Sequence, residues 1–201
     1  MSTTQKMDLR ITGGKWKGRN VVPVPDPRTR FTPQKVRNAL FSSLQSTVCF
    51  GSSSFLDLCA GSGIVGFEAM SRGFSKVTFV DVSQVAISAL YKTMQSLSAG
   101  GEMEVRKQNA ISFVQKSRES FSVVFVDPPF NDTISRKVFL ALQQNETILE
   151  KTGILVVEHP AQWDKDTLFP RFRQKHHARY GSVCITMFGR EEEGSDEGNR
   201  H

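Results

Sequence analysis

The chain has 201 residues, which is enough for one domain with a sizeable core but too few for a second full domain. Hydrophobic residues make up 38% of it and charged residues 23%, so a collagen, a low-complexity chain and a wholly disordered chain are excluded. The formal net charge of +6 is concentrated near the N-terminus, where residues 1–50 carry nine lysines and arginines against two acids, and such a basic segment indicates a polyanionic partner.

The sequence shows no sign of a membrane or secretory context. Its longest apolar runs are only as long as a strand, whereas a spanning helix needs roughly 18 residues, and its N-terminus lacks an apolar signal core. The cysteines Cys49, Cys59 and Cys184 form no close pair, so we expect neither a disulfide framework nor a thiolate metal site. We therefore predict a cytoplasmic protein without a bound metal.

Residues 1–48 are predicted to form a basic N-terminal extension. A hairpin is expected over residues 9–24, because Gly13 and Gly14 supply a turn between two short extended segments. Prolines then favour an extended linker before the first helix. The side chains that this extension would offer to a polyanion are Lys15, Trp16, Lys17, Arg19, Arg28, Arg30 and Arg37.

The first helix is expected to have Thr32 as its N-cap and Pro33 as its first residue. Apolar residues at positions 36, 40, 41 and 44 share one helical face, which predicts that this face is buried. Lys35 and Arg37 fall outside that face, so we expect both side chains to be exposed.

From residue 49 to residue 190, short apolar strands alternate with amphipathic helices. Strands are predicted at residues 55–59, 76–81, 103–107, 121–126 and 154–158, and helices at 63–72, after Ser83, at 110–117 and at 134–142. This alternation is typical of a doubly wound α/β fold with a mostly parallel sheet.

The C-terminal part is predicted to differ from this alternation. Residues 171–180 and 183–188 are separated only by a Gly-Ser pair, which is too short for a parallel crossover, so we expect them to form an antiparallel hairpin that closes a seven-stranded sheet. Residues 191–201 are acidic and offer no apolar side chain to a core, so we expect a disordered tail.

A glycine-rich turn follows the first predicted strand of the sheet. The glycines Gly61 and Gly63 stand at a strand-to-helix junction, where the first backbone N–H groups of the helix remain free to bind a ligand. Asp81, at the end of the next strand, could accept hydrogen bonds from both hydroxyls of a ribose. Together these features predict a ligand that contains a nucleoside.

The identity of that ligand stays open at this point. With Gly66, the two glycines match the G-x-G-x-x-G pattern, so a dinucleotide-binding oxidoreductase is one alternative. Asp57, which precedes the turn, would instead repel a pyrophosphate and attract an ammonium group such as that of S-adenosylmethionine. A third interpretation is a glycine turn that only packs the helix on the strand.

A second motif, Asp127-Pro128-Pro129-Phe130, comes directly after the apolar strand FSVVFV. Two prolines would fix an extended turn that presents a carboxylate, a carbonyl and an aromatic ring at the carboxyl end of a central strand. An exocyclic amine is a poor nucleophile, because its lone pair is delocalised into the base. A carboxylate and a carbonyl that accept its N–H bonds make the nitrogen more electron-rich and stabilise the charge that develops during attack. We therefore predict that these four residues are catalytic.

With these motifs in place, the chain resembles the RsmD-type 16S ribosomal RNA guanine-N2 methyltransferases, which are class I S-adenosylmethionine-dependent enzymes. The resemblance covers about residues 10–190 and rests on the stretches RITGGKWKGR, RFTPQKVRNALF, DLCAGSGIVGFEAMSRG and VDPPF and on the closing hairpin. It implies a Rossmann-like fold, S-adenosylmethionine as cofactor and 16S rRNA as substrate. We expect a monomer that meets this RNA within a small-subunit particle.

The resemblance also assigns roles to residues. It implies that the cofactor is bound by Asp57, Ala60, Gly61, Gly63, Asp81, Val82, Asn109 and Ala110. The Asp127 to Phe130 turn would bind the amine, and the basic extension would face RNA. Three alternatives remain: an amino-methyltransferase for adenine or cytosine in DNA or RNA, an NAD-binding oxidoreductase, and an RNA-binding module without catalysis.

Overall fold

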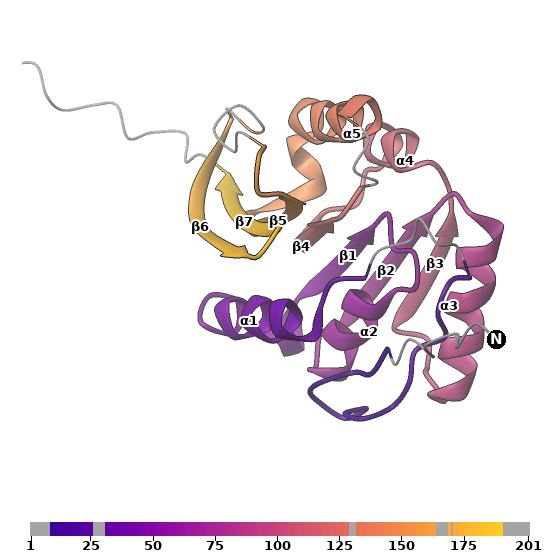
Figure 1. The fold of residues 1–201 in the computed structure, drawn as a ribbon. Coiled ribbons are helices and arrows are strands. Elements are labelled where there is room, and N and C mark those ends of the chain that lie inside the picture. The colour runs from indigo at the N-terminus through magenta and orange to yellow at the C-terminus, as the bar shows by residue number, and fades with distance from the viewer. Residues whose placement is uncertain (1–8, 26–30, 129–131, 164–168, 170, 191–201) are drawn as a thin grey trace, which may run out of the picture.

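A seven-stranded sheet forms the centre of the computed structural model, which describes residues 9–25, 31–128, 132–163, 169 and 171–190 (Figure 1). The strand order is β3-β2-β1-β4-β5-β7-β6. Neighbouring strands among β1 to β5 pair in parallel, and β7 pairs antiparallel with both β5 and β6. The strands are β1 (Ser54–Leu58), β2 (Lys76–Asp81), β3 (Met103–Lys107), β4 (Phe121–Val126), β5 (Leu149–Pro160), β6 (Phe172–Tyr180) and β7 (Val183–Arg190).

Helices cover both faces of the sheet, as the alternation of strands and helices predicts. One hydrophobic cluster joins the sheet to α1, α2 and α3, and a second joins the other face to α4 and α5 (Figure 1). Strand β4 is buried along its whole length, because it lies between these two clusters. The helices are α1 (Gln34–Gln45), α2 (Ile64–Ser71), α3 (Gln84–Ser96), α4 (Ala110–Lys116) and α5 (Asp132–Gln144).

The predicted α/β fold with a closing antiparallel hairpin is confirmed, and most boundaries agree within two residues. Strand β5 is the exception, because it begins at Leu149 rather than at residue 154. Its first half contains the polar run Glu150-Lys151-Thr152, and its pairing with β4 shifts register between Phe121 and Val123. The first half of β5 is thus irregularly paired and lacks the continuous apolar pattern of a buried strand, so the sequence did not predict it as part of the strand.

The N-terminal hairpin exists, but its turn is not at Gly13 and Gly14. Antiparallel pairing is limited to a single bridge between Arg10 and Asn20, and the chain reverses over residues 14–19. Gly14 has φ +77°, and a Cβ atom there would lie 1.8 Å from the carbonyl oxygen of Ser71 at the end of α2. Contact with the end of α2 therefore determines where the hairpin turns. A pattern of turn residues in the sequence does not reveal such a contact.

Two predictions about the start of α1 are wrong. Thr32 is not the N-cap, because α1 begins at Gln34 after Pro33 and the Thr32 hydroxyl instead donates to the Glu158 carboxylate at 2.7 Å. Arg37 is not exposed: only 3% of it is accessible, although Lys35 is exposed as expected.

The burial of Arg37 has a clear physical cause. Glu68 on α2 is fully buried, and a buried carboxylate needs cationic partners. Arg37 Nε donates to Glu68 at 3.0 Å, and Arg72 donates to the other carboxylate oxygen at 2.7 Å. The remaining donors of Arg37 bond to the carbonyls of Thr32 and Arg10, at 2.6 and 2.7 Å. Arg37 is thus inaccessible to RNA, so its predicted place among the RNA-binding residues is corrected.

The N-terminal extension has no separate core in the part of the chain that is described. Leu9, Ile11 and Val21 belong to the same hydrophobic cluster as α1, α2 and the sheet. The predicted division at residue 49 stays a prediction. Among the described residues, no helix is both long enough and apolar enough to span a bilayer.

Replacement of Glu68 by glutamine should lower the free energy of unfolding by about 3–5 kcal/mol, because it leaves Arg37 buried without its counter-charge. The matched control is Glu104→Gln, which removes a carboxylate that pairs with Arg106 and Lys76 at the surface. That change should cost less than about 1 kcal/mol. Denaturant unfolding of both variants measures the difference, and equal losses would contradict the role given to Glu68.

Candidate active site

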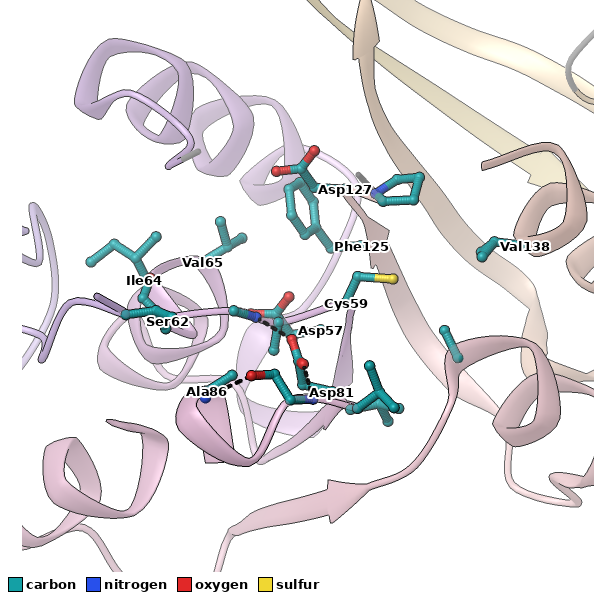
Figure 2. A pocket seen from close by; sticks show the side chains of 18 of the residues that line it. Asp57, Cys59, Ser62, Ile64, Val65, Asp81, Ala86, Phe125, Asp127 and Val138 are labelled. Carbon is teal, nitrogen blue, oxygen red and sulfur yellow. Dashed lines mark hydrogen bonds between the residues drawn. The ribbon is translucent and has the colours of Figure 1, made fainter. Parts of the chain in front are cut away.

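A cavity of about 770 Å³ opens at the carboxyl ends of β1, β2 and β4 (Figure 2). It lies where the strand order reverses, since the chain leaves β1 for one face of the sheet and β4 for the other. Most of the residues predicted for the cofactor and the amine meet in this cavity. Those that line it are Asp57, Ala60, Gly61, Asp81, Val82, Asn109, Ala110, Asp127 and Pro128.

The turn after β1 is built for tight packing. Gly61 and Gly63 have φ values of +54° and +73°, in the left-handed region that favours glycine. A Cβ atom on Gly63 would lie 2.3 Å from Leu90 and 3.0 Å from both Phe67 and Phe79. Gly63 itself is not part of the cavity wall, so its contribution is to let α2 start close to the sheet.

Asp57 is a buried carboxyl in the cavity wall, with only 2% of the residue exposed. Its Oδ2 accepts a hydrogen bond of 2.9 Å from the Gly66 N–H. Burial raises the pKa of Asp57 to about 8 against the opposing effect of that hydrogen bond, and the nearby Asp81 carboxylate adds to the rise. A cation that enters the cavity therefore favours the ionised form of Asp57.

Asp81 connects two turns at the cavity. One carboxylate oxygen accepts from the Gly61 N–H and the other from the Ser83 N–H, both at 2.8 Å. Each carboxylate oxygen has a further lone pair, so Asp81 can accept additional bonds from a ligand. Val82, next to it in the wall, is 64% exposed and offers an apolar surface.

Asn109 marks the far end of the cavity. Its side-chain oxygen caps α4 by accepting from the N–H groups of Ile111 and Ser112, at 3.0 and 3.3 Å. Ala110 and Ile111 follow it in the wall. The residue thus fixes the position of the first turn of α4 beside the cavity.

Asp127 follows β4 and lies on the other side of the cavity from Asp81 (Figure 2), and Pro128, the next residue, also lines the cavity. Cys59 lies between the two aspartates. Burial, and next the carboxylates of Asp81, Asp127 and Asp57, raise the pKa of the Cys59 thiol, so it stays protonated and is not a nucleophile at neutral pH. Pro129 and Phe130, the other two predicted catalytic residues, lie outside the described residues.

Some of the residues that line the cavity were not predicted from the sequence. Val24, Phe31 and Thr32 show that the N-terminal extension forms part of the cavity, although the sequence predicted for it only an RNA-facing role. Ile134 and Val138 on α5 also line the cavity. Their spacing of four residues along one helical face was the available signal, but such a pattern does not separate a cavity wall from a core.

The basic tip of the N-terminal hairpin is not brought to the cavity. Lys15, Lys17 and Arg19 are exposed, and Trp16 is half-buried against the core. The backbone N–H of Lys15 donates at 2.8 Å to the carbonyl of Ser71, the last residue of α2, whereas the cavity lies at the first turn of that helix. Their predicted contact with RNA stays a prediction.

Arg28 and Arg30, the remaining cations of the predicted RNA surface, lie outside the described residues.

The architecture and the position of the cavity define a Rossmann-like fold of the methyltransferase class. Solved structures agree: a putative methyltransferase from Escherichia coli (yhhF) has a TM-score of 0.80 and 30% identity over 92% of this chain and 98% of its own. A putative methylase from Haemophilus influenzae has a TM-score of 0.75 and 29% identity over 92% and 99%.

Sequence comparison identifies the family of the chain. The chain belongs to the family described as Conserved hypothetical protein 95, the RsmD family, whose model matches residues 9–189. Ribosomal RNA small subunit methyltransferase D of E. coli K12 is 30% identical over 94% of this chain and 93% of its own length. The H. influenzae protein of the same name is 33% identical over 82% and 84%. The resemblance that the sequence motifs indicated is therefore confirmed.

A Gly63→Ala substitution tests the packing of the turn after β1. The closest control is Gly18→Ala, because Gly18 also has a positive φ of +82° but a Cβ there would meet nothing within 4 Å. Backbone strain alone should cost Gly18→Ala about 1–2 kcal/mol. Crowding should cost Gly63→Ala about 1–3 kcal/mol more. Denaturant unfolding compares the two, and equal losses would show that Gly63 is needed only for its backbone torsion.

Proposed function

We propose that the protein transfers a methyl group from S-adenosylmethionine to the exocyclic N2 amine of a guanine in 16S ribosomal RNA. The observation that carries the proposal is a single cavity with two acidic ends. Asp57 and Asp81 lie at the carboxyl ends of β1 and β2, Asp127 lies across from Asp81 after β4, and Pro128 follows it in the cavity wall. Family relatives named ribosomal RNA small subunit methyltransferase D support both the reaction and the RNA substrate.

The donor set of the cavity fits S-adenosylmethionine. Asp57 is a buried carboxyl whose ionisation a positively charged ligand favours, which suits the methionine ammonium and the sulfonium. Asp81 has lone pairs for the ribose hydroxyls, and Val82 offers an apolar surface to the adenine. The remaining residues proposed to contact the cofactor are Ala60, Gly61, Asn109 and Ala110. When bound, this cofactor supplies an electrophilic methyl group.

The chain's own part in the reaction is to hold and activate the amine. The Asp127 carboxylate and the Pro128 carbonyl each accept one N–H of the amine, which raises electron density on the nitrogen. As the nitrogen takes the methyl group, it gains positive charge that the Asp127 carboxylate stabilises, and it then loses one proton, which leaves N2-methylguanosine and S-adenosylhomocysteine. Phe130 is assigned to stack on the base on the basis of the sequence motif alone. A base held in this way must leave its helix or loop and enter the cavity.

The proposal is tested by incubating the protein with labelled S-adenosylmethionine and either 16S rRNA or small-subunit particles, and then digesting the RNA to nucleosides. We expect label in N2-methylguanosine. Label in a methylated adenosine or cytidine would refute the guanine assignment, and absence of transfer to both substrates would refute the reaction. Binding of NAD in place of S-adenosylmethionine would favour the oxidoreductase alternative.

In the same assay, Asp127→Asn should lower kcat by about 100-fold or more, because the amide cannot stabilise positive charge on the amine. Its dissociation constant for S-adenosylmethionine should stay within about 3-fold of the wild type, since Asp127 faces the base. The matched variant is Asp81→Asn, which should weaken cofactor binding instead. Unchanged turnover in Asp127→Asn would contradict the activation mechanism.

The raised pKa of Asp57, about 8, predicts how cofactor affinity depends on pH. Below that pKa the free protein carries a proton on Asp57 and must release it when the cationic cofactor binds, so affinity should rise with pH by up to roughly tenfold per unit and level off above the pKa. Calorimetry over this range measures the effect. Asp57→Asn keeps an acceptor for the Gly66 N–H and should remove the dependence; an equally steep profile in this variant would assign the titration to the ligand.

A further inference from the structure

Exposed cations lie on the edge of the molecule where the cavity opens, outside the acidic interior of the site. Arg136 and Lys137 are in the second turn of α5, the helix that follows β4. Arg179 is the next-to-last residue of β6. All three side chains are exposed, and none of them belongs to an ion pair between side chains that the structure describes. We call Arg136, Lys137 and Arg179 the carboxyl-edge cations.

The sheet topology places Arg179 on the same edge as the cavity. Strand β5 runs parallel to β4 and ends at Pro160, which pairs with Val183 at the start of β7. Val183 in turn pairs with Tyr180 at the end of β6. The turn between β6 and β7 therefore lies beside the carboxyl ends of the parallel strands. Arg179 Nε donates to the Gly181 carbonyl at 2.9 Å, which holds the side chain at this turn.

Of the two cations on α5, Lys137 is the one next to the cavity, whereas Arg136, two positions from both Ile134 and Val138, lies on the other side of the helix. Ile134 and Val138 line the cavity, and Lys137 follows Ile134 by three residues, so it lies beside the lining face of the helix. From β4 to β6 there are three strand spacings, or about 14 Å, which a few nucleotides of RNA can span. Lys137 beside the cavity and Arg179 on β6 are therefore within reach of one short stretch of RNA, and Arg136 adds an exposed cation on the same turn of α5 as Lys137.

The charges inside the cavity make outside cations necessary. Asp81 and Asp127 line it, and their carboxylates repel the phosphates on either side of a base that enters. A nucleic acid can therefore deliver a base to this cavity only if cations near the mouth hold its backbone. The carboxyl-edge cations meet that requirement among the described residues of the C-terminal half.

The exposed cations of the N-terminal hairpin have a different environment. Lys15 Nζ lies 4.5 Å from the centre of the Trp16 ring, and Arg19 donates at 2.6 Å to the carbonyl of Ser96, the last residue of α3. A cation at a helix C-terminus stabilises the helix dipole. The hairpin tip also contacts the end of α2 that is remote from the cavity. Lys15 and Arg19 thus make contacts within the protein itself, at the end of the sheet remote from the cavity.

We propose that Arg136, Lys137 and Arg179 bind the sugar-phosphate backbone of the substrate RNA next to the nucleotide whose base enters the cavity. The proposal rests on the proposed function for the entry of a base, but it concerns backbone contacts, which do not depend on which base is methylated. It makes the carboxyl-edge cations, rather than the hairpin tip, the main anchor for RNA near the site.

A charge-matched pair of variants tests this proposal. One is R136Q/K137Q/R179Q, and the control is K15Q/K17Q/R19Q, which removes the same number of exposed cations from the hairpin tip. Dissociation constants for transcribed 16S rRNA are measured over a series of salt concentrations. We expect the first variant to lose about tenfold or more in affinity for RNA. The slope of the logarithm of its association constant against the logarithm of the salt concentration should become shallower by about 2, because three phosphate contacts are lost. The control should change affinity by less than about threefold.

Two further measurements distinguish a loss of RNA contacts from a loss of folding. Cofactor binding and circular dichroism of both variants should match the wild type, since none of the substituted side chains is buried or lines the cavity. Equal losses in the two variants, or a larger loss in the hairpin variant, would overturn the proposal. If the first variant loses RNA affinity as expected but the wild-type protein transfers no methyl group, the proposed function is refuted and the proposed RNA contact stands.

Discussion

The reversal of strand order between β1 and β4 is the constraint on which the site depends. Because the connections from these two strands pass to opposite faces of the sheet, none of the described helices fills the space above their carboxyl ends. The turns after β1, β2 and β4 all end there, which brings Asp57, Asp81 and Asp127 into one cavity. These carboxylates come from distant parts of the chain, and the pairing of β1 with β2 and β4 brings them together.

Buried charge pairs at Glu68 hold the N-terminal extension against the helices that cover the sheet. Glu68 on α2 binds Arg37 on α1 and Arg72 on its own helix, and Thr12 of the hairpin also donates to it. A buried charge network of this kind adds little net stability over apolar packing, but removal of one partner is costly. We infer that the network determines where the extension lies, and hence that Val24 and Phe31 reach the cavity wall.

The sequence predicts features that depend on local pattern and misses those that depend on distant partners. Parallel strands buried on both faces give continuous apolar runs such as FSVVFV, so the order of elements and the two acidic turns were predictable. The burial of Arg37 was not, because it depends on Glu68, 31 residues away in the chain. The hairpin turn depends in the same way on Ser71, and the role of Phe31 in the cavity depends on how the extension packs.

The central claim is that cofactor and base meet in one cavity, with the amine held by Asp127 and Pro128. The most direct measurement is a structure of the protein with S-adenosylhomocysteine and a fragment of its RNA substrate. The account predicts the guanine N2 atom within about 3 Å of both the Asp127 carboxylate and the Pro128 carbonyl, with the cofactor at Asp57 and Asp81. A base bound outside this cavity, or a cofactor bound away from the turn after β1, would contradict it.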